Sequence, residues 1–414
     1  MKHSIQHIFI IGKVWPEPGS SAAGIRMIQL IRLFIEEGWK VTFATAAGDS
    51  EFAADLESMG VKTAAIKVNS SAFDSLIKKS DPDVVLFDRF MTEEQFGWRV
   101  SEQCPEALRV LDTEDLHCLR QARQRAWNGG IEFDPPMLFD EESSKREIAS
   151  IYRCDLSLMI SEMEINFLEN LFNVPANLIH YLPYLYDPIS KEQIQSLPGF
   201  EERSGFVSIG NFLHEPNWNA VLWLKEEIWP GIRDRLPDAE LHIYGAYPTQ
   251  KVYQLHEPEN GFFIKGRVEN AEDVIRKARV LLAPLRFGAG LKGKLVDAMM
   301  NGTPSVSTPV GAEGIAKRND WCGMIQESAD SIAEDAAKLY LDIDLWEKCR
   351  DTGFRIFNEK FNKALYGDKF IVLLYDLKSS LTRHRRNNFT GAMLMHHTIA
   401  STKFMAKWIE AKNR

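Results

Sequence analysis

The chain has 414 residues, of which 45% are hydrophobic and 26% are charged, and its formal net charge is −9 at pH 7. These values are typical of a globular protein, and the length suits two domains of roughly 100 to 200 residues each. They argue against a fibrous or extended protein, and the acidic balance disfavours a non-specific nucleic-acid binder, because phosphate backbones favour a basic surface.

The N-terminus leads directly into a short apolar run at 8–11, without the longer apolar core of a signal peptide. No uninterrupted apolar run approaches the roughly 18 residues that a membrane-spanning helix needs. The five cysteines are scattered and form no closely spaced pair of metal ligands. We therefore expect a cytoplasmic protein with reduced thiols and no metal.

The first half of the chain alternates short apolar strands with amphipathic helices. The pattern predicts a strand at 8–11, a loop at 12–24, a helix at about 25–37 and strands at 40–45, 62–68, 84–87, 108–111 and 156–160. Strands that are apolar throughout and separated by helices are typical of a parallel, doubly wound sheet, in which both faces are covered.

A polar segment at 187–204 interrupts this alternation and is interpreted as an interdomain linker, because it contains Pro198-Gly199 and several charges. The alternation then restarts with a strand at 206–209, a helix at 216–228 and strands at 240–244, 262–265, 280–283 and 305–307. The fold class expected is α/β, with two Rossmann-like doubly wound domains facing a cleft. In such sheets ligands bind beyond the carboxyl ends of the strands.

The most informative segment follows the predicted strand at 280–283. A loop rich in glycine and lysine at 286–294 leads into a helix at 295–301. Glycines let the backbone approach an anion, the amides of a helix N-terminus point at it, and basic side chains neutralise its charge. The candidates for binding a diphosphate are Arg286, Gly290, Lys292, Gly293 and Lys294. No Asp-x-Asp pair flanks the loop, which favours a site without metal.

The second half resembles the nucleotide-sugar-binding domain of retaining GT-B glycosyltransferases of the group 1, or family-four, type. The motifs that carry the resemblance are VSIGNF at 207–212, WNA at 218–220, PDAELHIYG at 237–245, GRV at 266–268, FGAGLKGK at 287–294, DAM at 297–299 and Gly-Thr-Pro at 302–304. They occur in the order that the family shows and cover about 205–315. The resemblance implies the GT-B fold and a nucleotide-sugar donor, with no cofactor.

The resemblance also implies roles for single residues. Asp297 stands where the family usually has a glutamate that contacts the ribose, although it would also complement the dipole of its helix. Gly210 and Asn211 end a strand where the backbone approaches the donor, and Arg267 belongs to the segment near the base; ordinary turns would explain Gly210 and Arg267 as well. Ala289 replaces a second glutamate that contacts the donor sugar, so sugar recognition must differ here.

A looser resemblance covers the first half. The segment 19–24, with Ser21 and Gly24, looks like the loop after the first strand that faces the acceptor. The segment 111–117 looks like the strand end that places polar groups in the cleft, with Asp115 and His117 as catalytic candidates. A histidine can hydrogen-bond a phosphate or sugar hydroxyl, and a carboxylate can orient the acceptor hydroxyl. A purely structural role is the alternative for His117.

The C-terminal part has its own character. The apolar stretch 370–377 resembles the GT-B helix that crosses back to the first domain. We therefore expect domains at 1–186 and 205–365, followed by the crossing helix and a basic tail at 366–414. A helix-compatible segment at 393–412 carries aromatic and basic residues. It is interpreted either as docked on the first domain or as a peripheral contact with the inner face of a membrane.

The sequence therefore predicts a hexosyltransferase-like glycosyltransferase, as in polysaccharide biosynthesis. It would move a sugar from a nucleotide-sugar to a glycan, lipid-linked or small acceptor, with retention and without metal. Two alternatives stay open: a nucleotide-sugar-binding protein with a decayed catalytic site, suggested by Ala289, and a GT-B-type epimerase. A dehydrogenase is disfavoured because the loop at 12–24 has no Gly-x-Gly-x-x-Gly spacing.

Overall fold

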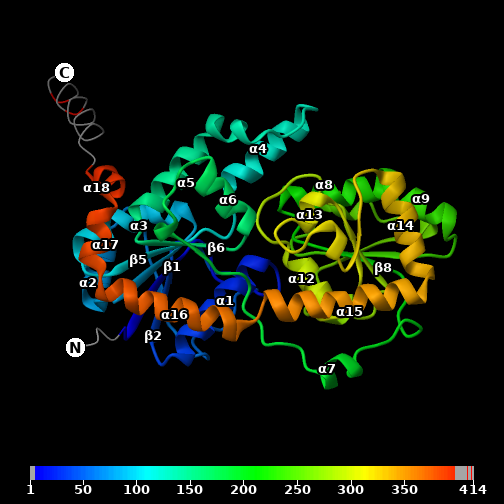
Figure 1. The fold of residues 1–414 in the computed structure, drawn as a ribbon, viewed down its shortest axis with the longest axis horizontal. Coiled ribbons are helices and arrows are strands. Elements are labelled where there is room, and N and C mark those ends of the chain that lie inside the picture. Colours follow the sequence, from blue (N-terminus) through cyan, green and yellow to red (C-terminus); the bar gives the residue numbers. More distant parts are fainter. Residues whose placement is uncertain (1–4, 397–407, 409–411, 413–414) are drawn as a thin grey trace.

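The computed structural model describes residues 5–396, 408 and 412. Two parallel sheets with helices on both faces form two domains that lie side by side along the long axis (Figure 1). The first sheet has the strand order β3-β2-β1-β4-β5-β6-β7, and the second has the order β10-β9-β8-β11-β12-β13. The prediction of two Rossmann-like, doubly wound domains is confirmed.

The first domain is built around a sheet whose central strands are almost entirely buried and whose two edge strands, β3 and β7, are not. They are β1 (His7–Gly12), β2 (Lys40–Thr45), β3 (Lys62–Ala65), β4 (Val84–Asp88), β5 (Leu108–Asp112), β6 (Leu156–Met159) and β7 (Ile179–Tyr181). The helices are α1 (Ala22–Glu36), α2 (Ala72–Ser80), α3 (Phe90–Gln103), α4 (His117–Asn128), α5 (Glu142–Arg153) and α6 (Glu162–Asn170). β1 and β4 are buried at every position, which explains why their sequences are apolar without alternation.

The second domain repeats this plan with shorter strands. They are β8 (Phe206–Ile209), β9 (Leu241–Tyr244), β10 (Phe262–Gly266), β11 (Val280–Ala283), β12 (Ser305–Ser307) and β13 (Gly323–Ile325). Its helices include α8 (Glu215–Trp223), η3 (Leu224–Ile228), α9 (Trp229–Arg235), α11 (Ala271–Ile275), α12 (Gly293–Met300), α13 (Pro309–Ala312) and α14 (Ala329–Leu341).

The helix predicted at 216–228 does not end there but continues through one π turn, η3, into α9. Pro230 explains the π turn, because proline has no N–H to donate and its ring would clash with the carbonyl four residues earlier. The helix predicted at 295–301 begins earlier, at Gly293, so Asp297 lies in its second turn and not in its first.

Two segments connect the domains. The linker at 187–204 contains a short helix, α7 (Lys191–Ser196), and α15 (Ile343–Lys360) passes into α16 (Lys363–Ser379), which returns to the first domain (Figure 1). Phe370, Leu374 and Leu377 of α16 join the buried cluster that contains Phe34 and Trp39. The predicted crossing helix is therefore confirmed.

The chain then continues along the first domain as α17 (Leu381–Asn387) and α18 (Phe389–Met395). Arg385 forms two hydrogen bonds of 2.7 Å with the carboxylate of Asp155, and Asn388 donates to the carbonyl of Tyr152 at 2.7 Å. The start of the basic tail is therefore docked, whereas most of the segment predicted as a helix at 393–412 lies outside the described residues. Within the described part of the chain, no helix has the length and apolarity to cross a bilayer.

Candidate functional site

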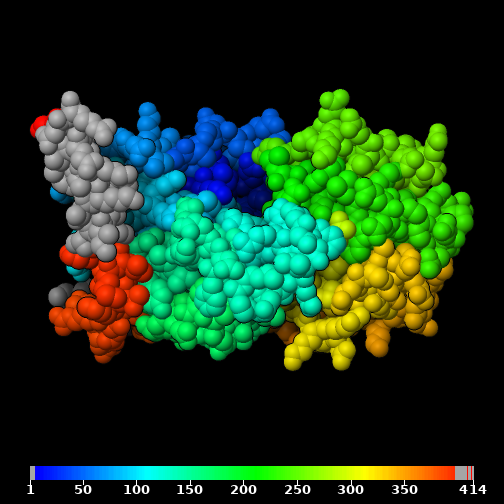
Figure 2. All heavy atoms as spheres, turned by 90° about the horizontal axis from the view of Figure 1, so that it is seen from above, coloured from blue at the N-terminus to red at the C-terminus, as the bar shows by residue number. Residues whose placement is uncertain are grey.

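A cavity of about 620 Å³ lies between the domains, at the carboxyl ends of both sheets. Figure 2 shows the recess between the two halves, with residues near the N-terminus at its floor. In the first sheet the strand order reverses between β1 and β4, and in the second it reverses between β8 and β11. Open α/β sheets bind ligands at such reversals, so the cavity occupies the expected position in both domains.

Most of the residues predicted from the sequence converge on this cavity. The predicted residues that line it are Ser21, Gly24, Asp115, His117, Gly210, Asn211, Arg267, Gly290, Lys292, Gly293, Lys294 and Asp297. They come from loops that are up to 276 positions apart in the chain, counted from Ser21 to Asp297. The arrangement brings acceptor-side and donor-side candidates into one space.

Arg286 is the exception, since it does not line the cavity. Its Nε donates a hydrogen bond to Asn219 at 2.7 Å, and its guanidinium lies 4.3 Å and 5.0 Å from the ring centroids of Trp127 and Trp223. These contacts hold the side chain outside the cavity, between the two indole rings. The donor-binding role predicted for Arg286 is not supported by its position.

The start of α12 meets the start of α1 across the domain boundary. A Cβ on Gly293 would lie 2.7 Å from the Cβ of Ala22, so only glycine permits this approach. At α1, Ser21 accepts a hydrogen bond from the amide of Gly24 at 3.0 Å, which is a typical N-terminal cap. A Cβ on Gly24 would clash with the carbonyl of Glu17, so the acceptor-side loop folds tightly onto this helix end.

The two lysines of the loop differ in their contacts. The Nζ of Lys292 is buried and donates to the carbonyl of Gly290 at 2.8 Å, so this ammonium stabilises the loop itself. Among the described residues, the Nζ of Lys294 donates only to the side chain of Asn217, at 2.8 Å. Burial lowers the pKa of both lysines to about 8, and the charge of Lys292 contributes to the shift in Lys294. Lys294 is therefore the freer cation for a ligand.

Gly290 connects the loop to the first domain. Its φ of 65° is in the left-handed region, and a Cβ there would lie 2.9 Å from the Cβ of Asp115. Its amide donates to Oε1 of Glu164 at 2.8 Å, and the same oxygen accepts the amide of Leu116 at 3.1 Å. The amide of Gly290, predicted to be available for phosphate, is thus already used. Glu164 was not predicted, because a single glutamate within α6 carries no sequence signal.

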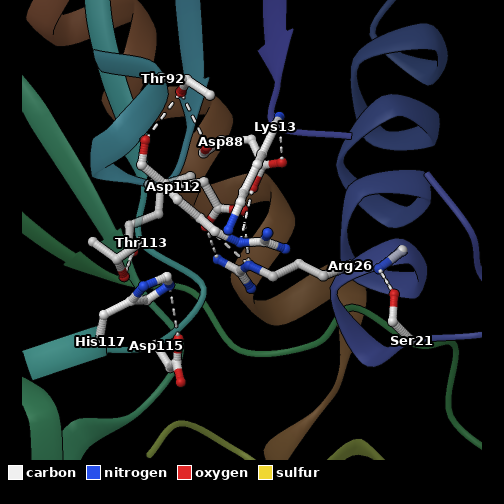
Figure 3. A network of polar contacts seen from close by, with 12 residues as sticks. Lys13, Ser21, Arg26, Asp88, Thr92, Asp112, Thr113, Asp115 and His117 are labelled. Atoms are coloured by element: carbon white, nitrogen blue, oxygen red, sulfur yellow. Dashed lines mark hydrogen bonds and ion pairs between the residues drawn. The ribbon is translucent and has the colours of Figure 1, made fainter. Parts of the chain in front are cut away.

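Asp115 and His117 lie together on the first-domain side, as Figure 3 shows. Oδ1 of Asp115 is 3.5 Å from Nε2 of His117, and Oδ2 contacts the guanidinium of Arg120. Burial lowers the pKa of His117 to about 3, against the effect of Asp115, so the imidazole is neutral at pH 7. Although burial opposes its ionisation, Arg120 and His117 lower the pKa of Asp115 to about 2.

A buried ion pair beneath this site fixes the first helix to the sheet. The guanidinium of Arg26 binds the carboxylate of Asp112 through Nη2 at 2.8 Å and Nε at 2.9 Å (Figure 3), and its Nη1 donates to the carbonyl of Leu182 at 2.7 Å. Both ionic side chains are at most 1% exposed. Removing one partner of such a pair typically costs about 3 to 5 kcal/mol, so the pair holds the cavity floor firmly.

Asp297 faces the donor side from α12. Burial raises the pKa of its carboxyl to about 7, with a further contribution from Glu272, whereas Lys294 opposes the shift. Asn211 donates through Nδ2 to the carbonyl of Ser20 at 3.5 Å, and Arg267 stacks on Phe52 at 3.9 Å from the ring centroid. Residues predicted for the donor site therefore also contact the first domain.

Further cross-domain contacts border the cavity. Arg123 of α4 forms a bidentate pair with Glu313 at 2.5 Å and 2.8 Å, and it also donates to the carbonyl of Gly288 at 2.8 Å. The hydroxyl of Tyr247 donates to Oε2 of Glu17 at 2.7 Å. Together they hold the two domains in one arrangement around the cavity.

The cationic residues of the cavity that the sequence did not predict include Lys13 and Arg89. Each lies directly after a strand of the first sheet, β1 and β4 respectively. Position after a buried strand was the signal that could have found them. Within the described residues, no group of three or more His, Cys, Asp or Glu side chains is arranged as a metal site.

The comparisons with known proteins agree with this geometry. Residues 203–342 match the family model described as glycosyl transferases group 1. The group 1 match covers β8 to α14, which contains the lysine loop and Asp297. No curated protein matches the chain significantly.

Solved structures share the fold over almost the whole chain. Sucrose-phosphate synthase from Thermosynechococcus elongatus has a TM-score of 0.68 at 15% identity, with 91% of this chain and 100% of that chain covered. A mutant of TarM from S. aureus, in complex with fondaparinux, alpha-GlcNAc-glycerol and UDP, has a TM-score of 0.67 at 10% identity. This match covers 89% of this chain and 100% of that chain. HepE from Anabaena, in complex with UDP-glucose, has a TM-score of 0.65 at 12% identity, with 90% of this chain and 100% of that chain covered. The fold is therefore GT-B.

Proposed function

We propose that the protein is a glycosyltransferase that transfers a sugar from a nucleotide-sugar to a glycan, lipid-linked or small acceptor, with retention of configuration and without metal or cofactor. The observation that carries the proposal is the shared cavity. It places Lys294 and the start of α12 on one side, opposite Asp115 and His117 on the other. A donor and an acceptor could meet only at such a boundary between the two domains.

The donor would bind along the second domain. Its diphosphate would contact Lys294 and the amides at the start of α12, where helix N-termini and cations favour anions. Asp297 would accept hydrogen bonds from the ribose, and the base would lie toward Arg267. Negative charge grows on the diphosphate as the glycosidic bond breaks, so these fixed groups would stabilise the transition state more than the bound donor.

The acceptor side would supply orientation and charge. Asp115 is ionised at neutral pH, so its carboxylate would stabilise positive charge at the sugar or orient the acceptor hydroxyl. His117 is neutral, so its ring would exchange hydrogen bonds with a phosphate oxygen or a sugar hydroxyl without adding charge. Asp115 would therefore supply negative charge, whereas His117 would supply only hydrogen bonds.

A thermal-shift screen against UDP-, GDP-, ADP- and dTDP-sugars tests the donor site. A ligand that binds only the native state raises the melting temperature. UDP-sugars come first, since TarM and HepE were solved with UDP or UDP-glucose. We expect one nucleotide class to stabilise the protein, Lys294→Gln to abolish that shift, and Arg383→Gln, an exposed cation on α17, to retain it. Absence of any shift would contradict the proposal.

One alternative has a specific observation in its favour. Ala289 lines the cavity with a methyl group where the resemblance implies a carboxylate for the donor sugar, so the protein would be a nucleotide-sugar-binding protein with a decayed catalytic site. Donor binding without turnover, over a panel of glycan and lipid-linked acceptors, would support this alternative. Isomerisation of the donor would instead indicate an epimerase.

A peripheral membrane contact through the C-terminal tail also remains a proposal. The docked part, α17 and α18, leaves Phe389 70% exposed and Met393 56% exposed next to Arg383 and Arg386, which are exposed too. An apolar surface beside basic residues suits an anionic bilayer. Vesicle flotation of the full chain and of a variant lacking 381–414 tests this contact, and equal binding of both would rule it out.

A further inference from the structure

Two cations stand at the reversal of strand order in the first sheet. Lys13 follows β1, and Arg89 follows β4, and these strands are neighbours with Ile11 paired to Phe87. Both side chains line the cavity. Because ligands of doubly wound sheets bind at this reversal, the two cations occupy the position where the first domain would hold its own ligand.

Neither cation is fully neutralised by the protein. Within the described residues, the ammonium of Lys13 donates no hydrogen bond and forms no ion pair, and the ionic contact of Arg89 is a 3.5 Å approach of its Nε to Oδ1 of Asp88. Oδ2 of Asp88 is occupied by the backbone amide of Lys13 at 2.9 Å, as Figure 3 shows. Asp88 therefore contacts the guanidinium of Arg89 and the backbone, but not the ammonium, of Lys13.

The other charged groups around them are paired or neutral. Arg120 is paired with Asp115, and Arg26 with Asp112. The carboxyl of Glu114 has a pKa raised to about 8, chiefly by burial, so it adds no full charge at neutral pH. The excess positive charge at this end of the cavity therefore rests on Lys13 and Arg89.

The two cations lie close to each other, and the carboxylates that raise the pKa of Arg89 against its burial are those of Asp88, Glu114, Asp115 and Asp112. Burial lowers the pKa of Lys13, and the nearby charges of Arg89 and Arg120 lower it further. Arg89 is also held at a φ of 69°, a conformation that is rare outside glycine, by a 2.7 Å hydrogen bond from its amide to the carbonyl of Asp112. Such strained backbone is concentrated at ligand-binding positions.

We propose that the acceptor carries an anionic group, a phosphate or a carboxylate, which binds between Lys13 and Arg89 at the reversal between β1 and β4. This inference rests on the proposed function and names the class of acceptor. The shared chemistry is a compact anion, either on a soluble sugar or on a lipid headgroup. A neutral glycan would bring no negative charge to either cation.

The test uses the purified full chain, with binding measured by calorimetry and thermal shift. The probes are inorganic phosphate, glucuronate, neutral glucose, and phosphatidylcholine vesicles with or without phosphatidate. The variants are Lys13→Gln and Arg89→Gln, with Lys348→Gln, an exposed cation on α15 that lies outside both the cavity lining and the C-terminal tail, as the matched control. Each titration is repeated in a Lys294→Gln background, which removes the main cation of the donor side.

We expect the soluble anions or the phosphatidate vesicles, but not glucose, to bind the Lys294→Gln background. Lys13→Gln and Arg89→Gln should each weaken this binding about tenfold or more, as expected for loss of a charge-assisted hydrogen bond. Lys348→Gln should not change it. Binding of soluble anions would indicate a soluble acceptor, and binding of vesicles alone would indicate a lipid-linked one; both support the proposal.

Equal binding by the parent and both variants would overturn the proposal, as would absence of binding by every anionic probe. Because Lys13 lies in a loop and its ammonium makes no hydrogen bond within the described residues, Lys13→Gln keeps the test valid even if Arg89→Gln fails to fold. The outcome is separable from the proposed function. A protein that binds a nucleotide-sugar through Lys294 but ignores all anions at Lys13 would retain that function and lose only this inference.

Discussion

The two halves of the cleft are built on sheets of the same strand order, yet they present different chemistry. The second domain contributes Lys292 and Lys294 from one continuous loop before α12. The first domain contributes Lys13, Arg89 and Asp115 from the ends of three separate strands. One half therefore concentrates its site in a local motif, and the other assembles it from distant segments.

This difference explains what each half can recognise. A diphosphate is a fixed chemical unit, so one loop and one helix start can hold it in many proteins. An acceptor varies in shape, and separate loops can change independently around it. The family match at 203–342 falls on the second domain, which holds the local motif. The predictions below test how far the two halves act separately.

The largest effect is expected on the donor side. Lys294→Ala should lower kcat/KM by about 100-fold or more, because loss of one preorganised donor to developing charge has effects of this size. The nucleotide-induced thermal shift should fall as well. Circular dichroism and the melting temperature of the unliganded variant control for folding. A variant with full activity would exclude Lys294 from the donor site.

On the acceptor side, Asp115→Asn and His117→Ala should lower kcat by about 100-fold while nucleotide binding stays unchanged. The measurement is initial rate beside a thermal shift with the nucleotide. The pKa of His117, about 3, further implies that kcat has no titration step between pH 5 and 8 from this group. If both variants retain full transfer rates, neither residue is catalytic.

The contact between the halves should have an intermediate effect. Arg123→Ala removes the ion pair with Glu313 and the hydrogen bond to the Gly288 carbonyl. The arrangement of the two domains seen in the structure should therefore become less populated. We expect about a tenfold loss in kcat/KM, in line with removal of a charge-assisted pair. Small-angle scattering should show a larger radius of gyration. An unchanged radius with full activity would contradict a clamping role.

Donor affinity should depend on pH above neutrality. The pKa values of Lys292 and Lys294 are lowered to about 8, and an anion binds their protonated forms. Affinity should therefore be highest below pH 8 and fall by up to about tenfold per pH unit for each lysine as pH rises through this value. Calorimetry from pH 6.5 to about 9.5 measures the slope, and Lys294→Gln should flatten it.

The smallest effect is expected for Arg286→Gln. The arginine lies between Trp127 and Trp223, outside the cavity, so transfer should change less than about twofold while stability falls by about 1 kcal/mol. Denaturant unfolding and initial rates measure the two quantities. A large loss of activity with unchanged stability would instead support a donor-binding role for Arg286.

The central strands were predictable because burial on both faces leaves a continuous apolar signal. β2, β8, β11 and β12 have the predicted bounds. The strands β7 and β13 were missed, since each is a three-residue edge strand that is largely half-buried and too short to show a pattern. The π turn at η3 was missed as well, although Pro230 marks the place where it is needed.

Site residues that are neighbours in the sequence were predictable, and those that depend on distant contacts were not. Lys292, Gly293 and Lys294 stand together in the sequence, so glycine and lysine spacing revealed them. Glu164 and Arg123 contact the second domain through partners more than 100 positions away, at Gly290 and Glu313. No local pattern contains such a contact, because it depends on how the two domains are placed. A donor-binding role was predicted for Arg286 from its position in the loop. The two tryptophans that hold its side chain outside the cavity belong to helices distant in the sequence.

The crossing of α16 onto the first domain has a consequence for biosynthesis. Phe370, Leu374 and Leu377 complete the buried cluster around Phe34, although more than 300 residues separate them in the chain. The first domain emerges first from the ribosome, but its core stays open until the last helices have been synthesised. The second domain, whose core needs nothing beyond α15, can fold earlier. Nascent chains that stop before 370 would therefore expose apolar surface of the first domain and be substrates for chaperones or proteases.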